Sequence, residues 1–201
     1  MSKKFVIIDA MALAYKAYFA FISRPLLSSK GEPTSATFGF ITQLLKVLED
    51  FKPDYISIAF DSKEKTFRHE KYENYKSSRQ AMPDDLIPQI GRIKSIIEAM
   101  NIPLYILPRY EADDIVGTAV CKAEAKGLES FAVTPDKDYV QLVTDKVKIV
   151  KPGKSSEENI ILDKQKVIEL YGFEPALMID RLRGHGRSRP RGRGHVWRGT
   201  R

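Results

Sequence analysis

The sequence predicts an α/β fold with a mostly parallel central sheet flanked by helices. Short apolar runs alternate along the chain with segments whose apolar residues recur at helical spacing, and this alternation is typical of parallel α/β sheets. Three of the strand-like runs end in an acid, at Asp9, Asp61 and Asp136. With 201 residues, 43% of them hydrophobic, the chain can form one such domain around a real core.

Five short runs are predicted to be the strands of this sheet. KFVIID, at residues 4–9, is an apolar run that ends in an acid, and DYISIAFD, at 54–61, repeats that pattern. Three further apolar runs follow at residues 102–107, 129–136 and 146–150. Apolar runs of this length, bounded by polar or turn-forming residues, favour buried strands.

Three segments between these runs are predicted to be helices, at residues 36–51, 83–100 and 111–126. In each segment, apolar residues recur every three or four positions and so share one helix face. The third segment begins with the acids of EADD. Acids in the first turn are stabilised by the helix dipole, so one or two of them would need no further function.

The composition limits the setting and the partners. One cysteine, Cys121, excludes a disulfide framework and fits a reducing, cytoplasmic setting. Asp9 and Lys16 interrupt the apolar N-terminal run, so we expect neither a signal peptide nor a membrane span. The net charge of +7 comes from residues 181–201, which hold eight arginines and no acid; the remainder has 25 Lys and Arg against 26 Asp and Glu. Net charge alone is therefore weak evidence for nucleic-acid binding.

Seven carboxylates are expected to meet at one edge of the sheet. They follow strands or begin the third helix, and they are Asp9, Asp61, Glu111, Asp113, Asp114, Asp136 and Asp138. Ligands of open α/β sheets bind at the carboxyl ends of the strands, so a parallel sheet would gather these acids. Each one alone could be a solvent-exposed carboxylate. Together they must be neutralised by protons or cations, and residues 1–180 offer no cluster of arginines.

A set of oxygen ligands without histidine or cysteine suits Mg²⁺ or Mn²⁺ rather than Zn²⁺. Acids enough for two ions favour a two-metal site for phosphoryl displacement. Other chemistries fit less well. The first strand is followed by no glycine-rich loop, and residues 1–180 contain no Gly-x-Ser-x-Gly motif and only one histidine, His69. These observations count against dinucleotide-binding, P-loop and Ser-His-Asp enzymes.

Residues 60–83 mix basic and aromatic side chains. The members of this mixture are Lys65, Phe67, Arg68, His69, Lys71, Tyr72, Tyr75, Lys76 and Arg79. Rings that stack on bases, next to cations that bind phosphates, suit a single nucleic-acid strand passing an active site. Lys76 and Arg79 would share one helix face. The alternative is a solvated helix face whose charge is balanced by Glu64, Glu70 and Glu73.

Five segments resemble a known family: IIDAMALAYKAYFAF, SATFGF, IAFDSKEKTFRHEKYENYKSSR, YEADDIVGTA and TPDKDYVQLV. On these segments, from about residue 3 to residue 180, the chain resembles the 5′ nuclease domain at the N-terminus of bacterial DNA polymerase I, which is related to flap endonucleases. The resemblance implies a PIN-like 5′ nuclease fold with a helical arch. It also implies a Mg²⁺-dependent (or Mn²⁺-dependent) monomeric enzyme of replication and repair, which cuts 5′ ends or flaps from DNA, and RNA primers.

The resemblance also implies roles for particular residues. Around one metal ion it places Asp9, Asp61, Glu111, Asp113 and Asp114. At a second ion it places Asp136 and Asp138. Tyr75, Lys76 and Arg79 would lie in the arch, where Lys76 and Arg79 are the catalytic residues that hold the scissile phosphate. Two further predicted contacts to nucleic acid are Arg68 and Lys16, although many members carry arginine at the latter position.

The resemblance ends at residue 180. In the family, a Gly-Asp…Asp-Asn turn then supplies the last two metal carboxylates, and a helical hairpin grips the duplex. Here MID is followed by RLRGHGRSRPRG, so we expect a domain at residues 1–180 and a separate segment at 181–201. A frameshift near codon 180 is the leading hypothesis for that segment, and a genuine disordered Arg/Gly tail that binds nucleic acid is the alternative.

Without the last two carboxylates, we expect the second ion to bind weakly and turnover to fall. The sequence is therefore compatible with three functions. The first is a working structure-specific 5′ nuclease, and the second is a non-catalytic remnant that binds nucleic acid. The third is a single-strand RNase of the related small α/β type, which uses fewer acids.

Overall fold

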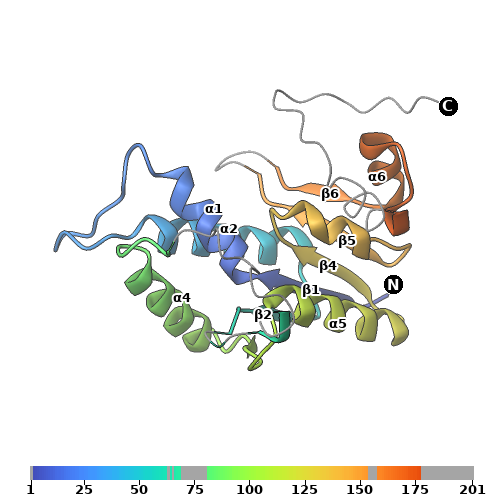
Figure 1. Cartoon of the computed structure of the whole chain (residues 1–201), viewed down its shortest axis with the longest axis horizontal. Coiled ribbons are helices and arrows are strands. Elements are labelled where there is room, and N and C mark those ends of the chain that lie inside the picture. The colour runs from blue at the N-terminus through green and yellow to red at the C-terminus, as the bar shows by residue number, and fades with distance from the viewer. Residues whose placement is uncertain (1, 63, 65, 69–80, 154–157, 178–201) are drawn as a thin grey trace.

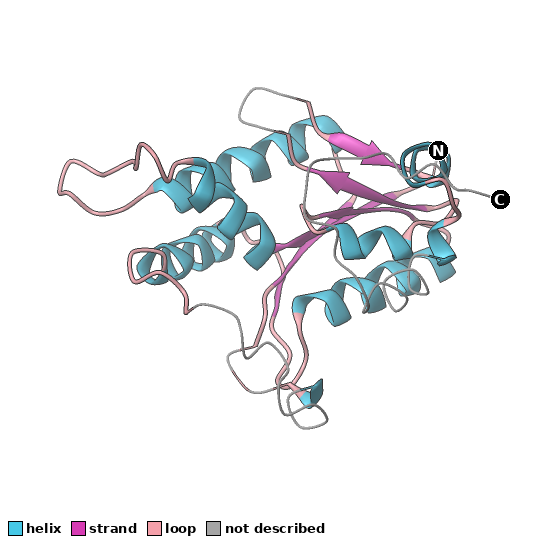
Figure 2. Ribbon diagram, turned by 45° about the horizontal axis from the view of Figure 1, so that its top comes forward, coloured by secondary structure: helices cyan, strands magenta, loops and turns pink. Residues whose placement is uncertain are grey.

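The computed structural model describes residues 2–62, 64, 66–68, 81–153 and 158–177. These residues form three layers, in which a six-stranded sheet lies between helices on both faces (Figure 1 and Figure 2). The strand order is β3-β2-β1-β4-β5-β6, and every neighbouring pair is parallel except β5 and β6. The predicted mostly parallel α/β fold is confirmed. The predicted arch and the segment at 181–201 lie outside the described residues.

All five predicted strands are present. They are β1 (Lys4–Asp9), β2 (Tyr55–Ala59), β3 (Leu104–Tyr105), β4 (Glu129–Val133) and β5 (Val147–Lys151). β3 is shorter than the predicted run because only two of its residues pair with β2 at the edge of the sheet. β6 (Ile160–Leu162), which pairs antiparallel with β5, was not predicted, since three residues are too few to show a strand pattern.

The three predicted helices are present as α2 (Ser35–Phe51), α4 (Ile87–Ala99) and α5 (Ala112–Ala125). The helical segments that were not predicted are α1 (Ala10–Ala20), η1 (Lys137–Leu142), α6 (Lys164–Tyr171) and η2 (Pro175–Leu177). Of these, η1 and η2 are 3-10 helices. None of the helices described here is long and apolar enough to cross a membrane.

Helix α1 is held firmly at the end of β1. It follows β1 without a loop, and the Asp9 side chain caps it by accepting a hydrogen bond from the backbone N–H of Ala12. The helix also packs closely on α2, since a Cβ added at Gly39 would lie 2.8 Å from the Cβ of Ala17. Any side chain at position 39 would push the two helices apart and so disturb the strand end at Asp9.

The sheet is buried on both faces, as parallel sheets usually are. Val6 and Ile8 pack with α1, α2 and α4, whereas Ile7 between them packs with α5, η1 and α6. The chain passes from β1 to β2 on one side of β1, and β4 then lies on its other side. The strand order therefore reverses between β1 and β4, and the carboxyl ends of strands at such a point form the usual ligand crevice of open α/β sheets.

Candidate active site

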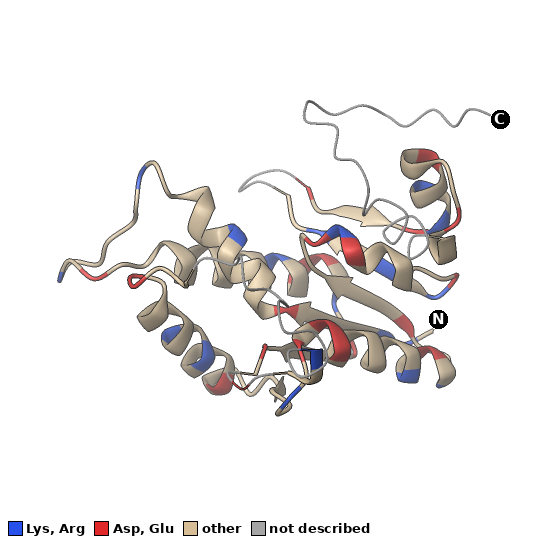
Figure 3. Cartoon of the chain, in the orientation of Figure 1, with Lys and Arg blue, Asp and Glu red and all other residues tan. Residues whose placement is uncertain are grey.

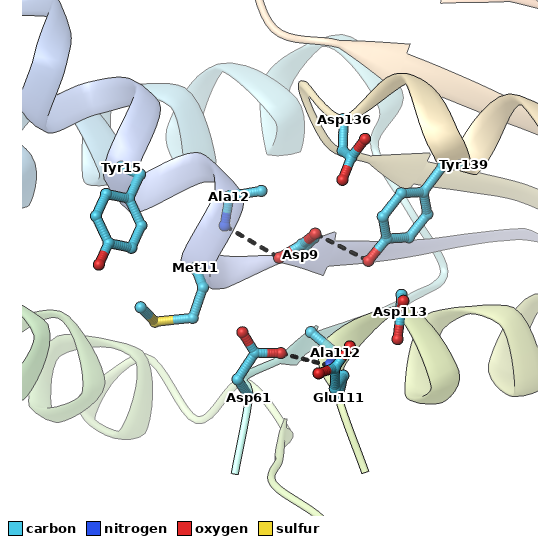
Figure 4. Close-up of a pocket in the computed structure, with 10 residues that line it drawn as sticks. All are labelled: Asp9, Met11, Ala12, Tyr15, Asp61, Glu111, Ala112, Asp113, Asp136 and Tyr139. Carbon is cyan, nitrogen blue, oxygen red and sulfur yellow. Dashed lines mark hydrogen bonds between the residues drawn. The ribbon is translucent and has the colours of Figure 1, made fainter. Parts of the chain in front are cut away.

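A pocket of about 360 Å³ lies at the carboxyl ends of β1, β2 and β4, beside the start of α5. Five acids line it: Asp9, Asp61, Glu111, Asp113 and Asp136. Figure 4 shows them around one space, and Figure 3 shows that acidic positions of β1, η1 and α5 lie near the centre of the molecule. The fold thus brings together five of the seven predicted acids, and their role as metal ligands stays a prediction.

Asp9 is buried at the end of β1. Its Oδ1 accepts a hydrogen bond from the N–H of Ala12 at 3.1 Å, and its Oδ2 accepts from the hydroxyls of Tyr139 at 2.8 Å and Thr134 at 3.3 Å. Burial raises the pKa of Asp9 to about 6; the hydrogen bonds from Ala12 and Tyr139 oppose this shift, and the charge of Asp61 adds to it. Within the described residues, only neutral groups donate to this carboxylate.

Asp61 and Glu111 are fixed where β2 meets α5. Oδ1 of Asp61 accepts a 2.7 Å hydrogen bond from the backbone N–H of Ala112, the first residue of α5. Glu111 is the N-cap of that helix, its side chain is buried, and its own N–H donates to Oδ2 of Asp114 at 3.1 Å. This junction joins the acids of β2 and α5 into one wall of the pocket.

Arg68 compensates the acids at the start of α5. Its two terminal nitrogens each donate to a carboxylate oxygen of Asp114 at 2.7 Å, and Nη1 also lies 3.4 Å from Glu111 and 3.7 Å from Asp113. Residues 1–180 contain no cluster of arginines, but this single arginine offsets the acids at the start of α5. The pKa of Asp113 is raised by burial, while the charge of Arg68 opposes that shift.

The seven acids do not all share the pocket. Asp114 is absent from its lining because a two-pronged ion pair turns its carboxylate to Arg68. Asp138, an exposed residue of η1, is likewise absent; its N–H donates to Oδ1 of Asp136 at 2.9 Å, while Asp136 itself lines the pocket. Burial and the charge of Asp136 raise the pKa of Asp138. Five of the seven acids therefore line the pocket, and Asp114 and Asp138 lie beside it, next to Glu111 and Asp136.

The predicted nucleic-acid contacts are only partly visible. The Lys16 ammonium donates hydrogen bonds to the carbonyl oxygens of Pro152 and, at 3.1 Å, of Gly153. Lys16 therefore holds the loop after β5, and Arg68 binds acids of α5. Contact of either side chain with phosphate stays a prediction. Other predicted contacts lie outside the described residues: Tyr75, Lys76 and Arg79.

Two hydroxyl residues of the site were not predicted from the sequence. Thr134 follows β4 directly and is fully buried, and Tyr139 lies on η1 with 4% of its surface exposed. Both donate to Asp9, and burial together with the charge of Asp9 raises the pKa of the Tyr139 phenol far above its usual range. Their only sequence signal is that they flank the two acids of TPDKDY.

The donor chemistry of the pocket fits a hard divalent cation, because five carboxylates line it and, among the residues that the structure describes, no histidine or cysteine does. As the side chains stand, no three His, Cys, Asp or Glu residues within the described part of the chain are grouped closely enough to hold a metal ion. The carboxylates would therefore have to draw together around an ion.

Comparison with known families decides where the chain belongs. The model of the family described as "5'-3' exonuclease, N-terminal resolvase-like domain" matches residues 4–172, which include all five pocket acids. The chain belongs to this family. Its relatives include DNA polymerase I of Chloroflexus aurantiacus, 41% identical over 182 residues, which cover 89% of this chain and 19% of the polymerase.

A second relative carries the family name alone. The 5'-3' exonuclease of Aquifex aeolicus is 37% identical over 180 residues, which cover 90% of this chain and 60% of that protein. DNA polymerase I of Bacillus subtilis is 41% identical over 179 residues, or 20% of its length. The chain thus spans about a fifth of the polymerases and less than two thirds of the shorter exonuclease.

Solved structures share the fold. The T5 5'-exonuclease with bound divalent zinc ions superposes with a TM-score of 0.65 at 17% identity, covering 88% of this chain and 64% of that one. The T5 D15 flap endonuclease in a pseudo-enzyme-product complex with DNA and metal ions gives 0.62 at 15% identity, with the same coverage. The predicted 5′ nuclease fold is confirmed.

Proposed function

We propose that this chain is the metal-dependent catalytic part of a 5′ nuclease that hydrolyses phosphodiester bonds at 5′ ends or flaps of DNA. The observation that carries the proposal is the pocket: β1, β2, η1 and the start of α5 each contribute acids to one space at the switch point of the sheet. The names of the relatives, DNA polymerase I and 5'-3' exonuclease, agree with it. Removal of RNA primers and a monomeric state belong to the same proposal.

Two Mg²⁺ or Mn²⁺ ions are the proposed cofactors. Asp9, Asp61, Glu111 and Asp113 would hold the first ion, and Asp136 with Asp138 would hold the second. Such ions, when bound, stabilise the attacking and leaving oxygens of phosphoryl transfer and lower the pKa of a bound water. Support comes from the five carboxylates that line the pocket and from the divalent ions named for the T5 structures.

The chain's own groups position the carboxylates. The N–H of Ala112 holds Asp61, and the hydroxyls of Tyr139 and Thr134 hold Asp9. Arg68 fixes Asp114, and Oδ2 of Asp114 in turn accepts a hydrogen bond from the backbone N–H of Glu111, the N-cap of α5. The carboxylates therefore start from restrained positions, which limits the reorganisation needed at the moment of reaction.

The binding of the DNA strand is proposed for other residues. Lys76 and Arg79 would hold the scissile phosphate, and Tyr75 would stack on a base; a phosphate contact is also proposed for Lys16 and Arg68. A bidentate arginine and a lysine point charge are the usual phosphate ligands of proteins. These roles rest on the family's motif as it stands in this sequence.

The test is cleavage of a labelled 5′-flap DNA over a Mg²⁺ titration. Wild type should release the flap, and Asp113→Asn, which removes one charge from the pocket, should abolish release. Asp145→Asn is the matched control, because Asp145 is an exposed acid outside the pocket lining. Absence of cutting at every Mg²⁺ concentration would favour a non-catalytic nucleic-acid binder. Preference for single-stranded RNA without a flap would favour the RNase alternative.

A further inference from the structure

The hydrogen bonds of Asp9 are distributed unequally between its two oxygens. Oδ2 accepts from Tyr139 at 2.8 Å and from Thr134 at 3.3 Å, whereas Oδ1 accepts only the N–H of Ala12 at 3.1 Å within the described residues. A carboxylate oxygen has about two lone-pair positions. The two hydroxyls therefore fill Oδ2, and Oδ1 keeps one position for a further partner.

The tyrosine is well placed to fix this arrangement. Its side chain is buried on η1 with 4% exposed, so the hydroxyl cannot swing into solvent. The phenol keeps its proton at neutral pH and donates along a short hydrogen bond. Figure 4 shows the ring reaching across from η1 to the end of β1, on the side of Asp9 away from Ala12.

The same contact joins two groups of acids. Asp136 caps η1, and Tyr139 lies one turn further along that helix. The hydroxyl of Thr134 makes a parallel link, because it accepts from the N–H of Asp136 at 3.2 Å and donates to Asp9. Any movement of η1 relative to β1 would therefore stretch the contact of Tyr139 with Oδ2 and the contact of Asp136 with Thr134.

We propose that the Tyr139 hydroxyl is a positioning group that turns Asp9 so that Oδ1 faces the pocket and binds the divalent cation. It also keeps the acids of η1 at a set distance from β1. This inference rests on the proposed function, since it assigns Asp9 to a metal ion. Outer-shell donors of this kind typically change metal affinity by roughly 10- to 100-fold.

The experiment is a Mn²⁺ titration of the metal-free chain, with free Mn²⁺ measured from its EPR signal. Tyr139→Phe keeps the ring and removes only the hydroxyl, and we expect the dissociation constant of the tighter site to rise roughly 10- to 100-fold. Tyr18→Phe is the matched control: it breaks a tyrosine–aspartate hydrogen bond of 2.9 Å, to Asp85, outside the pocket lining. It should change the constant less than about twofold.

Thr134→Val provides a second route if Tyr139→Phe does not fold, which circular dichroism would reveal. It removes the other hydroxyl on Oδ2 and should weaken Mn²⁺ binding, though less, because its contact is longer. Unchanged or tighter binding in the folded variants, with wild type binding normally, would overturn the inference and leave the proposed function standing. Failure of wild type itself to bind Mn²⁺ would overturn both.

Discussion

The acids at the strand ends and the acids at the start of α5 lie at the same edge of the sheet, yet they are held in different ways. Asp114 on α5 is paired with a cationic side chain, because the guanidinium of Arg68 donates a hydrogen bond of 2.7 Å to each of its carboxylate oxygens. Asp9 on β1 has only hydroxyl and N–H donors among the described residues. One carboxylate is thus neutralised within the fold, and the other keeps a charge that the fold orients but does not cancel.

This difference separates structural acids from acids available to a ligand. An ion pair with both partners in place stabilises the helix start and leaves little attraction for another cation. A buried carboxylate held by neutral donors still attracts a cation. Because burial disfavours its charged form, the pKa of Asp9 is raised to about 6. The two kinds of acid should therefore respond differently to substitution.

The largest expected difference is in activity. Asp9→Asn should reduce the rate of flap cleavage by more than roughly 100-fold, because it removes a proposed metal ligand and not only a group that positions one. Asp114→Asn should reduce it by less than about 10-fold, because that carboxylate faces Arg68 and not the pocket. Rates at saturating Mg²⁺ give the comparison, with circular dichroism to check folding. Equal losses in the two variants would remove the distinction drawn here.

A second prediction concerns stability in EDTA. Because the pKa of Asp9 is raised from 3.8 to about 6 on folding, the folded protein binds more protons than the unfolded chain between these values. The stabilising contribution of the protonated form is present below pH 3.8 and is lost as the pH rises through about 6. Ionised Asp9 therefore destabilises the fold by roughly 3 kcal/mol above that pH.

Asp9→Asn isolates this effect. The amide makes poorer hydrogen bonds at every pH, but it does not ionise, so the stability difference between variant and wild type should move in the variant's favour from pH 4 to 7 by up to roughly 3 kcal/mol. Urea denaturation at each pH measures the difference. Adding Mg²⁺ at pH 7.5 should stabilise wild type and reverse the trend, because ligands bind metal in their ionised form. A flat difference across the range would contradict the raised pKa.

The same contrast shows what the sequence could predict. Asp9, Asp61 and Asp136 were predictable as neighbours because each follows a strand, and parallel strands bring their carboxyl ends to one edge. The pairing of Arg68 with Asp114, which lies 46 residues away in the sequence, could not be predicted. A cation in a basic, aromatic segment can bind a phosphate or an acid equally well, and only the folded backbone decides which lies within reach.

The hydroxyls on Asp9 were hidden for a related reason. Tyr139 reaches it from η1, a 3-10 helix, and a short 3-10 segment shows no helical periodicity in the sequence. Thr134 reaches it from the position directly after β4. α1 was likewise missed because its apolar residues continue directly from β1. Periodicity predicts long amphipathic elements well, whereas short or fully buried elements leave no pattern.

The smallest expected effect tests the other side of the comparison. Arg68→Gln should lower the stability of the metal-free protein by about 1–2 kcal/mol, because it leaves Asp114 and Glu111 without their partly buried cation. Arg92→Gln is the matched control, since Arg92 pairs at 3.1 Å with the more exposed Glu32, and it should cost less than about 1 kcal/mol. Urea denaturation in EDTA gives both values.

Mg²⁺ should then restore more stability to Arg68→Gln than to Arg92→Gln, because only the former leaves uncompensated acids beside the pocket. If Mg²⁺ stabilised the two variants equally, Arg68 would not be taking the place of a metal ion beside the acids at the start of α5.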